Sequence, residues 1–333
     1  MTRKEIYSLI ILILVIGYGV VRYVTREYTE IKSQYLLDTI VEISASSQEK
    51  NVGDQVDDVF AFIKQLQQKF DEWNPNSWIY LVNNSTDTSF PMDSDAYEML
   101  VMADSLYRFS EGGFDITIKP VFDLWKYDTE DPAIPDSSLI KATLVNTGFS
   151  KIRFDKDRLY KPAGMQITFG ALAKGYILDK SKEYMISKGL SKGYINCRSS
   201  MTFFGSKIPQ IVYVQHPRRS DDIIASFKIK NLSVGTSGDY QQYFEVNGKR
   251  YHHIINPFTG YPVEHVYSLT VLNSSAAWSD GLSTALFIMN PNLAVEKIKT
   301  IPNSEALIYF EQNGSIVSLK TQGMKAHDLS EKL

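Results

Sequence analysis

The sequence predicts an α+β fold preceded by an N-terminal membrane-anchor helix, and three observations lead to this prediction. Segments with helical and with strand periodicity follow one another without regular alternation, which favours α+β over a doubly wound parallel sheet. Hydrophobic residues make up 44% and charged residues 22% of the 333 residues, a balance that can fill the core of an enzyme-sized domain. An uncharged apolar run stands near the N-terminus. We place the anchor at residues 1–26 and the folded domain at residues 35–330.

Charge and composition narrow the functional class. The formal net charge is -3 at pH 7, so no basic field indicates a nucleic-acid partner. The chain has five histidines and no Cys-x-x-Cys spacing, which argues against a zinc site. Its single cysteine, Cys197, cannot form an internal disulfide.

The N-terminal run has the features of a membrane span. Arg3 and Lys4 precede Ile6–Val21, roughly 16 residues without a charge, which is near the short limit for a span. Arg22 can extend its charged end to the interface and lengthen the span to Val24. No small-x-small cleavage site follows the run, so we expect a retained anchor. A cleaved signal peptide and a buried helix of a soluble protein are the alternatives.

The expected elements follow from hydrophobic spacing and turn residues. β-Branched residues at alternate positions predict a strand over Tyr35–Ser46. Apolar residues at helical spacing predict a helix over Asp54–Trp73, ended by a turn at residues 74–77. Further helices are expected over Ser94–Phe109, over Gly175–Lys188 with Gly189 as C-cap, and over Trp278–Met289. Further strands are expected at Ile211–Val214, Phe227–Ile229, Tyr243–Val246 and Ser268–Leu272, with a hairpin turn at Asn247-Gly248.

Two glycine-containing segments could approach a ligand through their backbone. The paired glycines of Gly112–Thr117 permit a close approach, although a plain loop in which Asp115 caps a neighbouring element is the alternative. Gly170–Gly175 opens a helix, and a helix N-terminus beside Lys174 suits a phosphate. Tight helix packing explains these small residues equally well, and the Walker spacing is absent from the segment.

Two later segments carry hydroxyl, acidic and imidazole side chains. Gly235–Tyr240 is followed by Tyr251–Pro257, whose two adjacent histidines could supply a general base. The alternative is a polar turn and a surface histidine pair. Asp280, Ser283 and Thr284 share one face of a predicted helix, and their oxygens suit a hard ion such as Mg2+. The alternative here is an N-capped helix with Asp280 in its first turn.

The four segments occur together and in this order, and the combination resembles the ApbE family over roughly Leu37 to Met289. Gly113–Thr117, with Pro120 and Leu124-Trp125, is similar to the family's G-x-F-D-x-T…P…L-W stretch. Ile167–Tyr176 is similar to its D-L-G-G-I-A-K-G-Y helix start, and Asp280–Leu286 to its D-x-L-S-T-A-L helix. Thr236–Tyr240 and Tyr251–Pro262 resemble the signature T-S-G-D-Y…Y-x-H-I-I-D-P-x-T-G-x-P, whose second part is the specific one.

This resemblance implies an FAD:protein FMN transferase with FAD as substrate and Mg2+ as cofactor. A threonine hydroxyl of a target flavoprotein attacks the FMN-side phosphorus, and AMP leaves. The resemblance implies His253 as the catalytic base and Asp280, Ser283, Thr284 and the backbone of Ala171 as metal ligands. Positions that match flavin-binding residues of the family are Trp73 (Tyr in the family), Gly113, Phe114, Asp115, Thr168, Lys174, Ser237 and Ile255.

The resemblance also implies a partner and a location. The expected target is a flavoprotein subunit of a membrane electron-transfer complex. The expected location is the cell inner membrane, with the catalytic domain in the periplasm or another extracytoplasmic space.

Several positions depart from the family pattern. Thr168, Ser200 and Asn256 are neutral where the family has acids, and Asn196–Ser200 lacks the two glycines of the family's N-L-G-G-D loop. Asn256 is expected to support His253 less than a carboxylate would. Arg198, in that loop, can reach a phosphate or obstruct the pocket. A membrane-tethered FAD-binding homologue with little or no transferase activity and a structural surface protein therefore remain alternatives.

Overall fold

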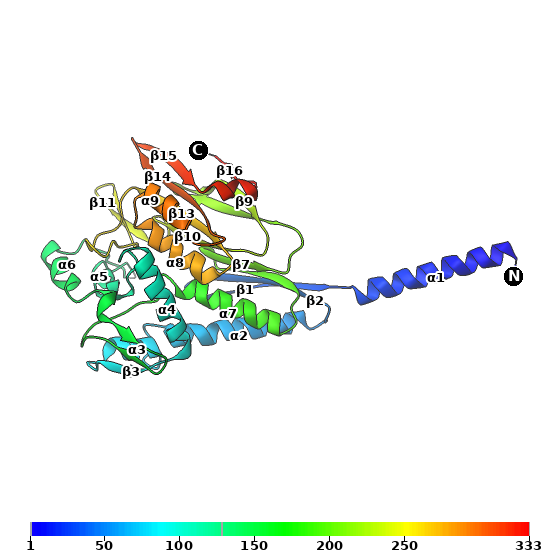
Figure 1. The fold of residues 1–333 in the computed structure, drawn as a ribbon, viewed down its shortest axis with the longest axis horizontal. Helices are drawn as coiled ribbons and strands as arrows, with labels where there is room; N and C mark the ends of the chain where they lie inside the picture. Colours follow the sequence, from blue (N-terminus) through cyan, green and yellow to red (C-terminus); the bar gives the residue numbers. More distant parts are fainter. Residues whose placement is uncertain (1, 128, 333) are drawn as a thin grey trace.

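The structure, a computed structural model, describes residues 2–127 and 129–332 (Figure 1). A single helix, α1 (Arg3–Val24), extends away from a body that contains helices and sheets. The centre of the body is an eight-stranded antiparallel sheet with the strand order β1-β2-β6-β7-β10-β13-β14-β15. The mixed, irregularly ordered elements confirm the predicted α+β class.

The sheets are built from the following strands. The large sheet contains β1 (Tyr28–Leu36), β2 (Thr39–Ser47), β6 (Lys192–Asn196), β7 (Ser200–Phe204), β10 (Ser233–Gly238), β13 (Val266–Asn273), β14 (Glu305–Gln312) and β15 (Ser315–Lys320). A second sheet contains β8 (Gln210–His216), β9 (Arg219–Ile229) and β16 (Ser330–Glu331). Two small sheets pair β11 (Tyr243–Val246) with β12 (Lys249–His252), and β5 (Arg158–Tyr160) with β3 (Ser89–Pro91) and β4 (Arg153–Phe154).

The large sheet lies between a helical layer and the second sheet. Helices α2 (Val52–Phe70), α7 (Ala173–Ser187) and α8 (Ala276–Phe287) pack on one face. Side chains alternate between the two faces of a strand. On β10, Gly235 therefore faces α8, where an added Cβ would stand 2.4 Å from the Ser279 backbone. Val234 points the other way, into the core shared with the second sheet.

The remaining helices surround this framework. They are α3 (Trp78–Asn84), α4 (Ser94–Phe109), α5 (Lys119–Leu124), α6 (Ser137–Leu144) and α9 (Pro291–Ile298), with short 3-10 turns at Ile116–Ile118, Phe149–Lys151 and Gln322–His327. The end of α7 confirms the predicted C-cap, because Gly189 has a positive φ of 81° and its N–H binds the carbonyl of Ile186.

One expectation from the sequence and two of the alternatives considered there are wrong in detail. The single strand expected over Tyr35–Ser46 is the end of β1, a turn at Leu37-Asp38 and most of β2. The polar turn considered for Gly235–Tyr240 is largely strand β10, in the interior of the large sheet. Helix α8 begins at Ala276, so Asp280 is its fifth residue and does not lie in the first turn.

Helix α1 is long and apolar enough to cross a membrane, by length and composition alone. None of its residues is buried, so the structure gives no support to a helix buried in a soluble core. A signal sequence would have the same properties. Only Thr25–Glu27 separate α1 from β1, and an ion pair between Glu27 and Lys192 fastens this short link to the body.

Candidate active site

Asp280 has a buried carboxylate between the start of α7 and strand β7. Oδ2 accepts a hydrogen bond of 2.9 Å from the backbone N–H of Gly175, and Oδ1 accepts one of 3.0 Å from the hydroxyl of Ser200. Burial raises the pKa of this carboxyl, although the two hydrogen bonds and the charge of Lys174 act in the opposite direction. A buried carboxylate held only by neutral donors is costly, so the position favours a bound cation.

Three hydroxyl groups from β10 and α8 gather one turn further along α8. The Oγ of Ser237 lies 2.8 Å from the Oγ of Ser283 and 3.1 Å from the Oγ1 of Thr284. Ser283 also donates to the carbonyl of Asp280, at 2.8 Å. This group forms because β10 runs along α8 and Ser237 shares the face of Gly235. Ser237, expected to contact flavin, thus lies among the predicted metal ligands.

The oxygen atoms of this group fit Mg2+. This ion prefers oxygen ligands, keeps several waters and is often held by one or two carboxylates plus substrate phosphates. No group of three or more His, Cys, Asp or Glu side chains that could hold a metal occurs in residues 2–127 and 129–332. A metal here would therefore rest on one carboxylate, with hydroxyls and a carbonyl beside it. Ala171, the backbone ligand expected, is half-buried two residues before α7.

A pocket of about 530 Å³ is lined by residues next in the chain to members of this group and to the partners of Asp280. Its walls come from the β1–β2 turn, the β6–β7 loop, strand β8 and the start of α7. Lys174 and Ser199 line the pocket. The residues that follow them, Gly175 and Ser200, donate hydrogen bonds to Asp280. Cys197 also lines the pocket, but burial raises the pKa of its thiol to about 12. The thiol therefore stays protonated and is a poor nucleophile.

The three neutral residues that replace family acids each make a defined hydrogen bond. Thr168 accepts from the N–H of Gly170, at 3.0 Å, in the turn that leads into α7. Ser200 donates to Asp280. Asn256 accepts from the N–H of Phe258, at 2.9 Å, and so stabilises the turn after the histidine pair. This bond gives Asn256 a role in forming the turn.

The two adjacent histidines have different environments. His252 is 3% exposed; its Nε2 lies 2.6 Å from the carbonyl of Val263, and its Nδ1 accepts from the N–H of Ile254 at 3.2 Å. Both ring nitrogens thus serve the fold. His253 is half-buried, and its Nδ1 lies 3.2 Å from the carbonyl of Gln242. Because a carbonyl can only accept, Nδ1 carries a hydrogen in this contact.

The buried state of His252 predicts a loss of stability in acid. Burial lowers its pKa from 6.5 to about 4, so the unfolded chain binds a proton that the folded chain does not. The contribution of the neutral ring to the free energy of unfolding has its highest value above about pH 6.5. It decreases by about 3 kcal/mol as the pH falls toward 4. Denaturant titration of wild type and His252→Gln at pH 7 and pH 4 gives the difference between their free energies of unfolding. We expect that difference to fall by about 3 kcal/mol from pH 7 to pH 4. A pH-independent difference would contradict the assignment.

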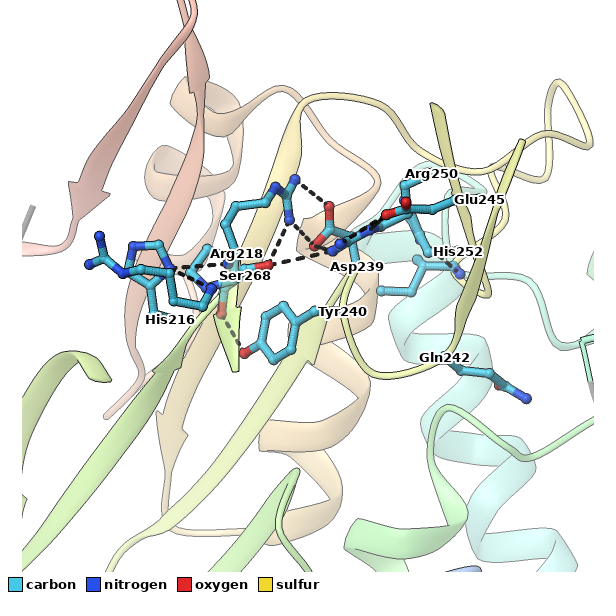
Figure 2. A network of polar contacts seen from close by, with 12 residues as sticks. His216, Arg218, Asp239, Tyr240, Gln242, Glu245, Arg250, His252 and Ser268 are labelled. Atoms are coloured by element: carbon cyan, nitrogen blue, oxygen red, sulfur yellow. Dashed lines mark hydrogen bonds and ion pairs between the residues drawn. The ribbon is translucent and has the colours of Figure 1, made fainter. Parts of the chain in front are cut away.

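A buried ion-pair cluster holds the chain segment that follows β10 (Figure 2). The carboxylate of Asp239 is bidentate to Arg218, at 2.9 and 2.7 Å, and lies 3.6 Å from the guanidinium of Arg250. Figure 2 shows both arginines directed at this carboxylate. Burial raises the pKa of Asp239, while the two arginines oppose that effect. The cluster joins the β8–β9 and β11–β12 hairpins to the end of β10.

This cluster positions two parts of the site. Tyr240 follows Asp239 directly and lines the pocket beside Lys174. Gln242, three residues after Asp239, holds the ring of His253 through its carbonyl. Neither arginine could be predicted from the sequence, since only the folded hairpins bring them to Asp239. The same is true of Asp179 of α7, whose carboxylate accepts from the N–H groups of Ala276 and Ala277 and so fixes the start of α8.

The other residues expected to bind flavin lie in two loops and on the surface. A Cβ on Gly112 would lie 3.4 Å from the Phe258 ring, and one on Gly113 would lie 3.6 Å from Ile288. The Gly112-Gly113 loop therefore contacts both the turn that contains Phe258 and the C-terminal end of α8. Asp115 accepts from the N–H groups of Thr117 and Phe149, which is the capping role considered as its alternative.

The apolar members of this set differ in exposure. Phe114 and Ile255 are 3% and 6% exposed and belong to hydrophobic cores, and the N–H of Phe114 donates to the hydroxyl of Ser110 at 2.7 Å. Trp73 is 77% exposed, and the amine of Lys119 lies 5.8 Å from the centre of one of its rings. The indole therefore presents an aromatic surface at the outside of the body.

Comparison with known proteins places the chain in a family. The sequence profile of the ApbE family matches residues 37–308. The chain is 26% identical to the FAD:protein FMN transferase of Haemophilus influenzae over 290 residues, which cover 83% of this chain and 84% of that protein. It is 28% identical to the FAD:protein FMN transferase of Klebsiella pneumoniae over 246 residues, covering 72% and 75%.

Solved structures give the same result for the fold. The ApbE protein of Thermotoga maritima superposes with a TM-score of 0.84 at 28% identity, covering 90% of this chain and 99% of that chain. The flavinyl transferase ApbE of Pseudomonas stutzeri superposes with a TM-score of 0.79 at 23% identity, covering 90% and 97%. Because the sequence and the fold agree over most of the body, the chain belongs to the ApbE family.

Proposed function

We propose that the chain is an FAD:protein FMN transferase, which moves FMN from FAD to a threonine hydroxyl of a target flavoprotein and releases AMP. The observation that carries this proposal is the buried carboxylate of Asp280, close to three hydroxyl side chains and to a pocket that Lys174 and Arg198 line. Phosphoryl transfer depends on positioning and charge neutralisation more than on covalent chemistry, and these residues can supply both. The names of the related proteins support the same reaction.

In the proposed reaction, the threonine oxygen forms a bond to the FMN-side phosphorus. The bond from that phosphorus to the oxygen bridging the two phosphates breaks, and AMP leaves with the bridging oxygen. His253 receives the threonine proton, and the contact of its Nδ1 with the carbonyl of Gln242 orients the ring. Asp280, Ser283, Thr284 and the carbonyl of Ala171 would hold Mg2+, which when bound neutralises phosphate charge.

The flavin-binding part of the proposal uses the folded domain at residues 35–330. The exposed indole of Trp73 offers a stacking surface for the flavin ring. The backbone of Gly113, Phe114, Asp115 and Ile255 would line the ring's other contacts, with Thr168, Lys174 and Ser237 on the phosphate side.

The test is an assay of the full-length chain in detergent with FAD, Mg2+ and a candidate target flavoprotein. We expect AMP in solution and flavin fluorescence that stays on the target after denaturing electrophoresis, and we expect EDTA to abolish both. FAD bound stably without AMP release would indicate an FAD-binding homologue. Neither binding nor release would indicate a structural protein.

We further propose that α1 (within residues 1–26) anchors the chain in the inner membrane, with the body in the periplasm or another extracytoplasmic space. The apolar, unburied helix supports an anchor, and a flavoprotein subunit of a membrane electron-transfer complex is the partner that such a location suits. We expect the protein in the membrane fraction with its N-terminus intact and its body accessible to protease from outside spheroplasts. N-terminal sequencing that starts beyond Val24 would show a cleaved signal.

A further inference from the structure

Arg198 occupies an unusual backbone position in the β6–β7 loop. Its φ is 67°, in the left-handed region that non-glycine residues rarely adopt. Its N–H donates to the side chain of Asn196 at 2.9 Å, and the carbonyl of the next residue, Ser199, accepts from the N–H of Thr236 at 2.7 Å. These hydrogen bonds hold the loop against β10 and fix the position of the Arg198 Cα. A strained conformation held by several bonds is a common feature of ligand-binding positions.

The pocket beside this loop has an excess of positive charge. Arg198 and Lys174 both line it, and Asp38 is the carboxylate among its lining residues. Within the described residues, neither the guanidinium of Arg198 nor the amine of Lys174 makes a hydrogen bond or ion pair. The arginines of the neighbouring cluster differ, because Asp239 neutralises Arg218 and Arg250. Lys174 acts on Asp280 through its charge alone, so both cations keep their hydrogen-bond donors for an anion in the pocket.

The other residues that line the pocket indicate which kind of anion it suits. Tyr213 from β8 and Tyr240 from the segment after β10 line the same pocket, and Tyr213 is 57% exposed. Aromatic walls beside cations suit a ligand that has a planar base as well as phosphate. A guanidinium binds two phosphate oxygens at once through its planar fork, whereas a lysine acts as a single point charge.

We propose that Arg198 is a specificity-determining residue: it adds a guanidinium beside Lys174 on the phosphate side of the pocket, binds the diphosphate of the dinucleotide substrate, and so favours phosphate-bearing flavins over riboflavin. This inference rests on the proposed function, since it takes FAD as the ligand. It assigns a binding role to an arginine at a position where the family's loop has glycine.

The test measures binding of FAD and riboflavin to the full-length protein by quenching of flavin fluorescence, with Mg2+ and without a target. We expect Arg198→Gln to weaken FAD binding by about tenfold, the loss typical of one charge-assisted hydrogen-bonded contact, and to leave riboflavin binding unchanged. Arg198→Lys should fall between wild type and Arg198→Gln. Lys207→Gln, which removes an exposed cation outside the pocket, is the matched control and should bind FAD as wild type does.

The results separate this inference from the proposed function. Equal FAD affinity in wild type and Arg198→Gln would overturn the role of Arg198, even if the wild type releases AMP. Tighter FAD binding by Arg198→Gly would overturn it as well, because it would mean that the arginine obstructs the pocket. Arg198-dependent FAD binding by a wild type that releases no AMP would uphold the role of Arg198 and reject the transferase.

Discussion

Replacing Asp280 with asparagine is expected to reduce Mg2+-dependent AMP release by on the order of a hundredfold or more, while the protein stays folded. The carboxylate is the one negative charge in the hydrogen-bonded group of Asp280, Ser237, Ser283 and Thr284. Asparagine keeps an acceptor for the N–H of Gly175 and removes a buried charge. The loss of activity should therefore come with no loss in melting temperature.

The effect on metal binding can be measured without activity. Mg2+ should raise the melting temperature of the wild type and leave that of Asp280→Asn unchanged, because an ion that binds only the folded state stabilises it. Asp157→Asn, in the exposed turn between β4 and β5, is the matched control and should respond to Mg2+ as wild type does. Full Mg2+-dependent activity in Asp280→Asn would remove Asp280 from the metal site.

Replacing His253 with glycine is expected to lower the rate of AMP release by about 100- to 10,000-fold, the range for loss of a positioned general base. FAD affinity should change little, since the proposed phosphate contacts are elsewhere. Added imidazole should restore part of the rate by entering the space left by the ring. The measurement is the rate of AMP release at saturating FAD, with and without imidazole.

His252→Gln provides the matched control for this experiment. Its ring is bonded to Val263 and Ile254 and has no nitrogen left for a substrate proton, so this change should affect stability more than the rate. The roles of the two histidines would be reversed if His252→Gln lost activity with rescue by imidazole while His253→Gly kept it.

The sequence predicted elements whose signals are local. The helix α2, the C-cap at Gly189 and the hairpin turn at Asn247-Gly248 follow from apolar spacing and glycine chemistry, and the structure has them. The β1–β2 turn was missed because Leu37 and Asp38 adopt positive φ values of 55° and 57° without glycine. Pairing of β1 with β2 imposes this turn, and no short-range signal announces it.

The sequence predicted which residues belong to the candidate site but not how they are arranged in space. The spacing of Asp280, Ser283 and Thr284 predicted that they share one face of a helix. The place of Ser237 among them depends on β10 lying against α8, which requires glycine at position 235 for close approach. In the same way, the partners of Asp239 come from hairpins whose pairing is a tertiary property.

Strand β1 would act as a spacer between the pocket and the membrane if α1 anchors the chain as proposed. Its nine residues reach about 30 Å, at roughly 3.3 Å per residue, and Asp38 and Thr39 at its far end belong to the pocket wall. If α1 anchors the chain as proposed, the short link at Thr25–Glu27 would limit how far the pocket can lie from the lipid surface. The search for an acceptor would then be restricted to a layer near the membrane, where proteins held in the same bilayer meet at high effective concentration. Target proteins would then be selected by the distance of their threonine from the membrane surface as well as by the sequence around it.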